Sequence, residues 1–143
     1  MAASEIFELE CEVRGFDCGY GASLKALSLA NFFQEAACLD AARRGFGMGD
    51  LASAGHTWML SRVDLRIAGL PKEGARVKVR TWPSGHERLF ALRDVVLEDS
   101  GGSPLVSAVY AYIIVDVAAR KPLRPEHALS PEFLGAQGAH SVA

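Results

Sequence analysis

The stretch Ser23–Phe46, SLKALSLANFFQEAACLDAARRGF, has a clear helical period. At about 100° per residue its apolar side chains form one broad face, and further apolar positions extend that face around much of the helix. The broad face comprises Ala26, Leu29, Ala30, Phe33, Ala37 and Ala41, and the extension comprises Leu27, Phe32, Cys38 and Leu39. Ser23 stands where an N-cap is expected and Gly45 where a left-handed C′ residue is expected. The stretch predicts a long helix, buried on most sides, around which the rest of the chain folds.

One polar stripe interrupts this apolar helix. Ser28, Asn31 and Glu35 are spaced i, i+3 and i+7, so they lie one above the other. A buried carboxylate is unfavourable unless it is paired or has a function. We therefore expect Glu35 to activate a water molecule or to attack a carbonyl directly, with Asn31 orienting the water or the carbonyl. The alternative is a structural ion pair or hydrogen bond of Glu35, for example with Arg62 from a strand.

Five segments have strand character. Residues 6–14 alternate apolar and charged side chains, which is typical of a strand with one buried face. Four more strands follow the helix, joined mostly by tight turns, one of them at residues 83–85: Thr57–Ala68, Ala75–Trp82, Arg88–Glu98 and Pro104–Val117. Residues 48–55 are expected to form a loop with at most a short helical turn. Tight turns make consecutive strands antiparallel neighbours. The fold class is therefore α+β, with one curved five-stranded antiparallel sheet wrapped around one long central helix.

Such a sheet has open edges, so we expect a second copy of the chain to pair with one of them. The length of 143 residues, half of them hydrophobic and 22% charged, indicates one domain that can bury a core without a disulfide or a metal. We place this domain in residues 1–125 and a surface tail in residues 126–143.

Charge and cysteine content narrow the possible functions. The net charge of −2 and the lack of a basic cluster argue against nucleic-acid binding. The three cysteines, Cys11, Cys18 and Cys38, have no metal-type spacing. Residues 1–13 have charges where a signal peptide would have an apolar stretch, and no run in the sequence is long and apolar enough to cross a bilayer. We expect a cytoplasmic protein with reduced thiols and no membrane span.

Several short motifs follow one another over residues 13–125: VRGFDCG, ANFFQEAA, GFG, WMLSR, TWPSG, ALRDVVLED, and VD followed by RKPLRP. Together with the order of the expected elements, these motifs resemble the acyl-ACP thioesterase family and its hotdog fold. The plant members carry two hotdog repeats, so the resemblance implies that a homodimer or a dimer of dimers replaces the pair here. It also implies hydrolysis of a thioester that links a fatty acyl chain to acyl carrier protein or coenzyme A, a role in fatty acid biosynthesis, and no metal or organic cofactor.

The loop before the helix departs from the family's pattern. Hotdog thioesterases of several kinds place acids there in patterns such as D-x-D-x-x-G. Asp17 matches the first acid, but Gly19 replaces the second, usually catalytic one. The Asn and His of the plant catalytic repeat fall on Gly21 and Ser23, whereas Glu35 matches the helix glutamate of that repeat. The loop therefore resembles that of a non-catalytic repeat, and Glu35 is the acid that remains for chemistry.

The same loop is a candidate for binding the thioester carbonyl. The N-terminus of a helix offers free amide donors and a partial positive charge, and glycines allow a close approach. We expect an oxyanion site at the amides of residues 21–24. The candidate substrate-binding residues here are Asp17, Gly19, Tyr20, Gly21 and, on the helix, Ser28. The alternatives are that the glycines only form a tight turn and that Asp17 caps the loop's own amides.

Two residues of the second strand complete the candidate site. His56, at the mouth of that strand, could reach a site between two copies, or it could be a solvent-facing loop histidine. Trp58 could line an acyl tunnel together with Met59, Phe32 and Phe33, or these residues could simply form core.

The leading hypothesis is thus a thioesterase. A non-catalytic acyl-binding or interaction protein is the competing one, and Gly19 favours it. A dehydratase or hydratase would need a His paired with an acid, and Ser23 stands where that His would be useful.

Overall fold

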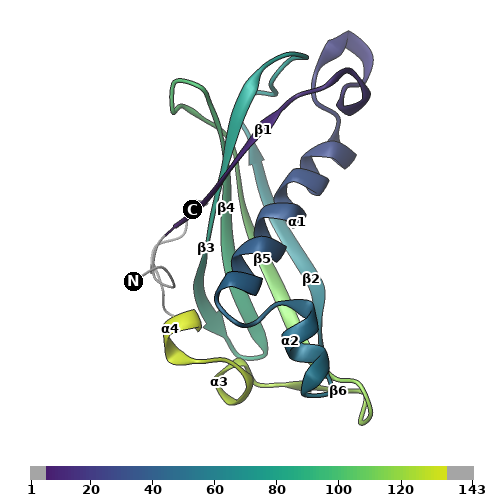
Figure 1. Ribbon diagram of the computed structural model, residues 1–143, viewed down its shortest axis with the longest axis vertical. Coiled ribbons are helices and arrows are strands. Elements are labelled where there is room, and N and C mark those ends of the chain that lie inside the picture. The colour runs from purple at the N-terminus through teal and green to yellow at the C-terminus, as the bar shows by residue number, and fades with distance from the viewer. Residues whose placement is uncertain (1–5, 135–143) are drawn as a thin grey trace.

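The computed structural model describes residues 6–134 of the protein, in which one strongly curved antiparallel sheet holds a long helix against its concave face (Figure 1). The strands are β1 (Phe7–Glu12), β2 (His56–Ile67), β3 (Arg76–Glu87), β4 (Phe90–Asp99), β5 (Pro104–Asp116) and β6 (Lys121–Leu123). Five of them lie in the order β1-β3-β4-β5-β2, and the short β6 pairs with the end of β5. The predicted α+β arrangement is confirmed.

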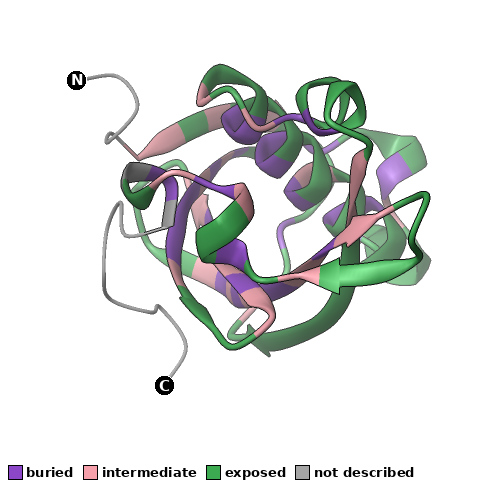
Figure 2. Cartoon of the chain, turned by 90° about the horizontal axis from the view of Figure 1, so that it is seen from below, coloured by how far each residue is buried: buried purple, intermediate pink, exposed green. Residues whose placement is uncertain are grey.

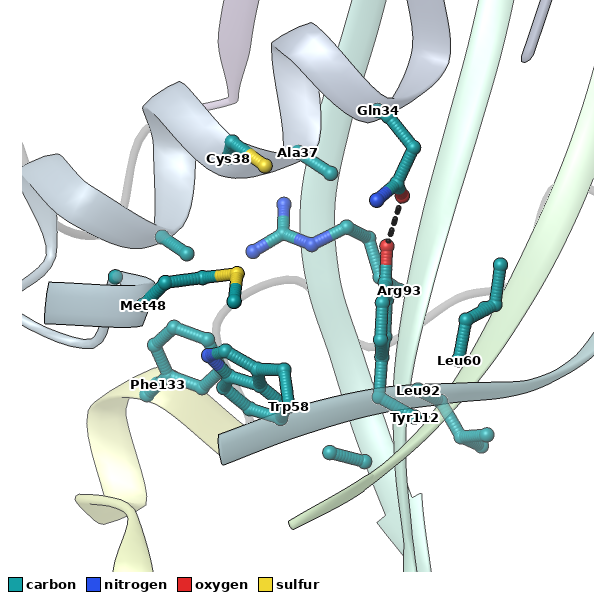
Figure 3. Close-up of a pocket in the computed structure, with 13 residues that line it drawn as sticks. Gln34, Ala37, Cys38, Met48, Trp58, Leu60, Leu92, Arg93, Tyr112 and Phe133 are labelled. Carbon is teal, nitrogen blue, oxygen red and sulfur yellow. Dashed lines mark hydrogen bonds between the residues drawn. The ribbon is translucent and has the colours of Figure 1, made fainter. Parts of the chain in front are cut away.

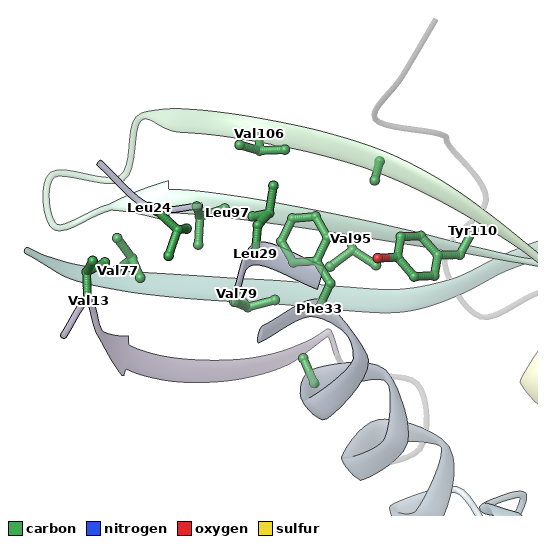
Figure 4. Close-up of a cluster of buried hydrophobic side chains, with 12 residues drawn as sticks. Val13, Leu24, Leu29, Phe33, Val77, Val79, Val95, Leu97, Val106 and Tyr110 are labelled. Carbon is green, nitrogen blue, oxygen red and sulfur yellow. The ribbon is translucent and has the colours of Figure 1, made fainter. Parts of the chain in front are cut away.

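The core lies between one side of helix α1 (Ala26–Arg43) and the concave face of the sheet. Figure 2 shows buried residues on the inner side of the curve and on the side of the helix that it encloses. Phe33 is 1% exposed, and its ring meets that of Tyr110 edge-on with 6.2 Å between centroids. Leu29 and Phe33 pack against valines of β3, β4 and β5 (Figure 4).

The outer side of α1 is exposed, which corrects the prediction of a helix buried on most sides. Asn31 and Glu35 are exposed, and Leu27 is 67% exposed. Glu35 follows Phe33 by two residues, so at about 100° per residue it projects from nearly the opposite side of the helix. The predicted burial of Glu35 is therefore wrong, because the sheet covers only one side of α1. No helix within residues 6–134 is long and apolar enough to cross a membrane.

Helix α1 begins later than predicted, after two short 3-10 turns, η2 (Gly15–Asp17) and η3 (Tyr20–Ala22). Its N-cap is Lys25 and not Ser23. The two residues that follow Ser23 are held by other loops: the amide of Leu24 donates to the carbonyl of Pro71, and that of Lys25 to the carbonyl of Asp17, both at 2.9 Å. Because these two amides are bonded to loop carbonyls, Leu24 and Lys25 belong to the loop, and the helix begins only after them.

Strand β3 continues through the predicted turn at residues 83–85, and that prediction is wrong. The strand has a bulge between Pro83 and Gly85, where its register with β4 shifts. Pairing with β1 ends at Thr81, so Pro83 lies beyond the part of β3 that has a neighbour on both sides. Proline is tolerated at bulges and at edges, which explains why the strand can pass through it.

The segment after β5 folds back onto the molecule, contrary to the predicted surface tail. Two short helices follow β6, namely α3 (Pro125–Ala128) and α4 (Pro131–Leu134). Leu129 and Phe133 are only 6% and 5% exposed and pack in a second buried cluster with Leu51 of helix α2 (Met48–Ser53). The rest of the predicted tail, residues 135–143, lies outside the described residues.

Candidate functional site

A pocket of about 100 Å³ lies between the C-terminal half of α1 and the sheet (Figure 3). Its mostly apolar lining comes from α1, α2, β2, β4, β5 and α4. The floor is buried and includes Ala41 and Ala91, whereas Met48 and Leu60 are 58% and 44% exposed. The pocket therefore has a mouth among α1, α2 and the first half of β2.

Aromatic side chains form one wall of the pocket. The indole N–H of Trp58 donates to the carbonyl of Phe46 at 2.8 Å, which fixes the plane of the ring. The Trp58 ring stacks on that of Phe133 with 6.1 Å between centroids, and it meets Tyr112 edge-on at 5.6 Å. This wall is held in place by contacts within the chain, so the pocket is preformed.

Two polar side chains face each other across the pocket. The hydroxyl of Tyr112 donates to the side-chain oxygen of Gln34 at 2.8 Å, the bond that is dashed in Figure 3. Burial raises the pKa of Tyr110 to about 12, and it also raises that of Tyr112. Both phenols thus stay protonated at neutral pH, and Tyr112 acts as the donor that orients the Gln34 amide.

A buried ion-pair cluster lies beside the pocket. The carboxylate of Asp40, 0% exposed, accepts from Arg43 Nε at 2.7 Å, from Arg44 Nε at 3.0 Å and from Arg93 Nη1 at 2.6 Å. Arg93 Nη1 also donates to Thr81 Oγ1 at 3.1 Å. We call Asp40, Arg43, Arg44 and Arg93 the Asp40 cluster. The buried acid of α1 is therefore Asp40 and not Glu35.

The predicted catalytic pair does not line this pocket. Asn31 and Glu35 lie on the outer side of α1, and Ser28 is buried at 5% exposure. Arg62, the suggested partner of Glu35, instead approaches Asp64 at 3.7 Å. Glu35 can therefore contact a substrate only if the substrate lies on the outer side of the helix.

The predicted loop candidates gather at the other end of α1. Twelve residues separate the start of α1 from Cys38 at the pocket, which corresponds to about 18 Å of helix. The Asp17 carboxylate accepts the backbone amide of Arg14 at 3.1 Å and so caps its own loop, as the structural alternative proposed. Gly19 and Tyr20 are exposed, and Gly21 has a positive φ of 81° that favours glycine.

The predicted oxyanion amides are partly engaged within the loop. The amide of Ala22 donates to the carbonyl of Gly19 at 3.1 Å, and the amide of Leu24 donates to that of Pro71. The amides of Ala22 and Leu24 are therefore not available to hold an oxyanion, and an oxyanion site at the amides of Gly21 and Ser23 stays a prediction.

Of the two predicted β2 residues, Trp58 lines the pocket, whereas His56 is the half-buried first residue of the strand. The sequence reasoning missed Gln34, Arg93, Tyr112 and Phe133. A usable signal existed for one of them, because Arg93 is a charge inside the apolar run of β4.

The chain was compared with known proteins. A family model described as the acyl-ACP thioesterase N-terminal domain matches residues 4–133. A search of curated proteins found no match. An acyl-ACP thioesterase from Bacteroides thetaiotaomicron superposes with a TM-score of 0.89 at 22% identity, over 100% of this chain and 58% of that one.

Two further solved structures are similar. The 12:0-ACP thioesterase from Umbellularia californica has a TM-score of 0.79 at 20% identity, over 92% of this chain and 52% of that one. The DHNA-CoA thioesterase from Staphylococcus aureus has a TM-score of 0.75 at 18% identity, over 85% of this chain and 82% of that one. The chain thus spans somewhat more than half the length of the two ACP thioesterases.

These likenesses confirm the hotdog fold, in which a curved antiparallel sheet wraps around a long helix. The family model spans nearly the whole chain, including every element from β1 to α3. The chain therefore belongs to the acyl-ACP thioesterase family.

Proposed function

We propose that the protein is a thioesterase that hydrolyses fatty acyl thioesters of acyl carrier protein or coenzyme A in the cytoplasm. The observation that carries this proposal is the preformed, mostly apolar pocket under α1 in a chain of this family. Buried apolar surface favours an acyl group in the pocket. The exposed mouth leaves the thioester and its carrier outside.

In this proposal Glu35 is the base or the nucleophile and Asn31 orients the water or the carbonyl. Both side chains project from the outer side of α1, so a second surface must cover them to exclude water and to hold the thioester. The site would then be complete only in an oligomer.

The edge strand β2 supplies a surface on which a second copy can pair. Val63 and Leu65 lie opposite Tyr110 and Ala108 of β5, so they share the concave face of the sheet, yet they are 40% and 44% exposed. Long apolar edge strands are sites of strand pairing. A twofold-related copy pairing at β2 would place the two α1 helices side by side in opposite directions. The loop before α1 of one copy would then lie near the pocket of the other.

Replacing Leu65 with lysine is expected to convert the dimer into a monomer, because the charge would be buried at the paired edge. Light scattering coupled to size-exclusion chromatography measures the mass. The matched control is Glu10→Lys on β1, the other edge of the sheet, which should leave the mass unchanged. A wild-type protein that is monomeric at micromolar concentration would contradict pairing at β2.

Filling the mouth of the pocket tests the acyl site. In Cys38→Phe the larger ring should occupy the mouth and reduce kcat/KM for hexanoyl-CoA by about tenfold or more, since the acyl group loses buried area. Leu39→Phe is the control, because Leu39 is the next residue of α1, is 40% exposed and does not line the pocket. Equal activities of the two variants would show that the acyl group binds elsewhere.

A non-catalytic acyl-binding module is the second candidate. The specific observation in its favour is the loop before α1, where Asp17 caps a backbone amide and Gly19 replaces the second acid. Such a module would bind acyl thioesters in the same pocket without releasing a thiol.

A further inference from the structure

The pocket contains a buried cationic group that an alkyl chain would leave without a partner. Arg93, whose side chain is 5% exposed, reaches from β4 into the pocket, and Figure 3 shows its guanidinium near Cys38 of the helix. Its Nη1 atom is held by Asp40 and Thr81. Its Nη2 atom is buried and has no hydrogen-bond partner among the described residues.

The position of this guanidinium is fixed. Two hydrogen bonds hold Nη1, and the carbon of the guanidinium lies 5.9 Å from the centroid of the Phe133 ring, within the range of a cation–π contact. The N–H groups of Nη2 therefore have no hydrogen-bond partner among the described residues.

A second donor lies close by. Because Tyr112 donates to the side-chain oxygen of Gln34, the amide nitrogen of Gln34 is free to face the pocket, as Figure 3 shows. The remaining surface of the pocket is largely apolar. The pocket thus offers hydrogen-bond donors within an apolar and aromatic surface, and its complement is an apolar group that carries an acceptor oxygen.

The volume limits the size of that group. A cavity of about 150 Å³ holds one benzene molecule, and this pocket has about 100 Å³. It therefore suits a short chain of a few carbons and not a long one.

We infer that the pocket selects short acyl groups whose far end carries an acceptor oxygen, a hydroxyl or a carboxylate, with Arg93 as the specificity-determining residue. This inference rests on the proposed acyl thioester function and names its substrate class. A plain alkyl end would leave Nη2 without a partner, whereas an oxygen would accept a charge-assisted hydrogen bond from it.

The test uses thioether analogues of coenzyme A, which cannot be hydrolysed, so that binding is measured apart from turnover. The probes are S-hexyl-CoA, S-(6-hydroxyhexyl)-CoA and S-(5-carboxypentyl)-CoA, titrated calorimetrically. We expect the two oxygen-bearing probes to bind about ten- to a hundredfold more tightly than S-hexyl-CoA, the range for a hydrogen bond to a charged group. A preference for the carboxyl probe alone, or for both probes, supports the inference and tells which acceptor is favoured.

Arg93→Lys keeps a positive charge near Asp40 but lacks the second amino group. Arg93→Lys should bind the oxygen-bearing probes less than about threefold more tightly than S-hexyl-CoA. The control Arg80→Lys, on the outside of β3, should keep the full preference for the oxygen-bearing probes. Thermal unfolding checks that both variants are folded. Equal binding of the three probes by the wild type, or a preference that survives in Arg93→Lys, would overturn the inference. Failure of the thioesterase proposal would instead appear as intact hexanoyl-CoA after incubation with wild-type protein, whatever the binding preference.

Discussion

Replacing Glu35 with glutamine is expected to lower kcat for hexanoyl-CoA hydrolysis by about a hundredfold or more, the usual contribution of a general base. The amide keeps the shape of the side chain but can neither accept a proton from water nor attack a carbonyl. Because Glu35 is exposed on the outer side of α1, the substitution should not lower the melting temperature. The measurement is the rate of thiol release at saturating substrate.

Glu87→Gln is the control for this prediction, because Glu87 is another exposed glutamate, at the end of β3 and away from α1. Its kcat should equal that of the wild type. If Glu35→Gln were as active as Glu87→Gln, the acid of α1 would have no part in the chemistry.

Replacing Asp40 with asparagine is expected to lower the free energy of unfolding by about 3–5 kcal/mol, the cost of breaking a buried ion pair. Asp40 is fully buried and accepts from three guanidinium groups, two of which come from its own helix and one from β4. Neutral asparagine would leave these charges without their carboxylate. Urea denaturation followed by circular dichroism gives the change, because urea adds no ions that screen the charges.

The matched control is Asp64→Asn, which removes an exposed ion pair to Arg62. Exposed pairs contribute less than about 1 kcal/mol, so this variant should unfold almost as the wild type does. A loss of stability in Asp40→Asn no larger than that in Asp64→Asn would mean that the cluster does not stabilise the fold.

The regular elements were predictable because each follows a local pattern. The alternation in residues 6–14 predicted β1 and its buried face, and the tight turns predicted the antiparallel order of the later strands. Helix α1 was also predicted, but the fraction of its circumference that is buried was not. A helix that is apolar on most sides does not reveal whether its own sheet or another molecule covers each side, and this is why the burial of Glu35 was mispredicted.

The Asp40 cluster shows what sequence patterns leave out. Asp40 and Arg93 are 53 residues apart, and each has an opposite charge close to it in sequence, Arg43 for Asp40 and Asp94 for Arg93. Only the register of β4 and the rotation of α1 bring them within hydrogen-bonding distance. The available signal was an acid in the apolar helix and an arginine in the apolar run of β4.

The sequence did not predict the pocket, for a related reason. It is assembled from helices and strands along most of the chain, and Phe133 comes from a segment without a clear period. Trp58 was found because an aromatic residue in a strand is a candidate for any apolar site, whereas Gln34 is a polar residue within an apolar helix and gave no such indication.

The central claim is that the protein turns over acyl thioesters and does not merely bind them. Its most direct test is one incubation of purified wild-type protein with excess hexanoyl-CoA, in which free thiol and bound ligand are both measured. We predict many equivalents of free coenzyme A and of hexanoic acid per protein chain. Saturable binding of intact hexanoyl-CoA, with no thiol released above the rate without protein, would contradict the thioesterase and favour the acyl-binding module.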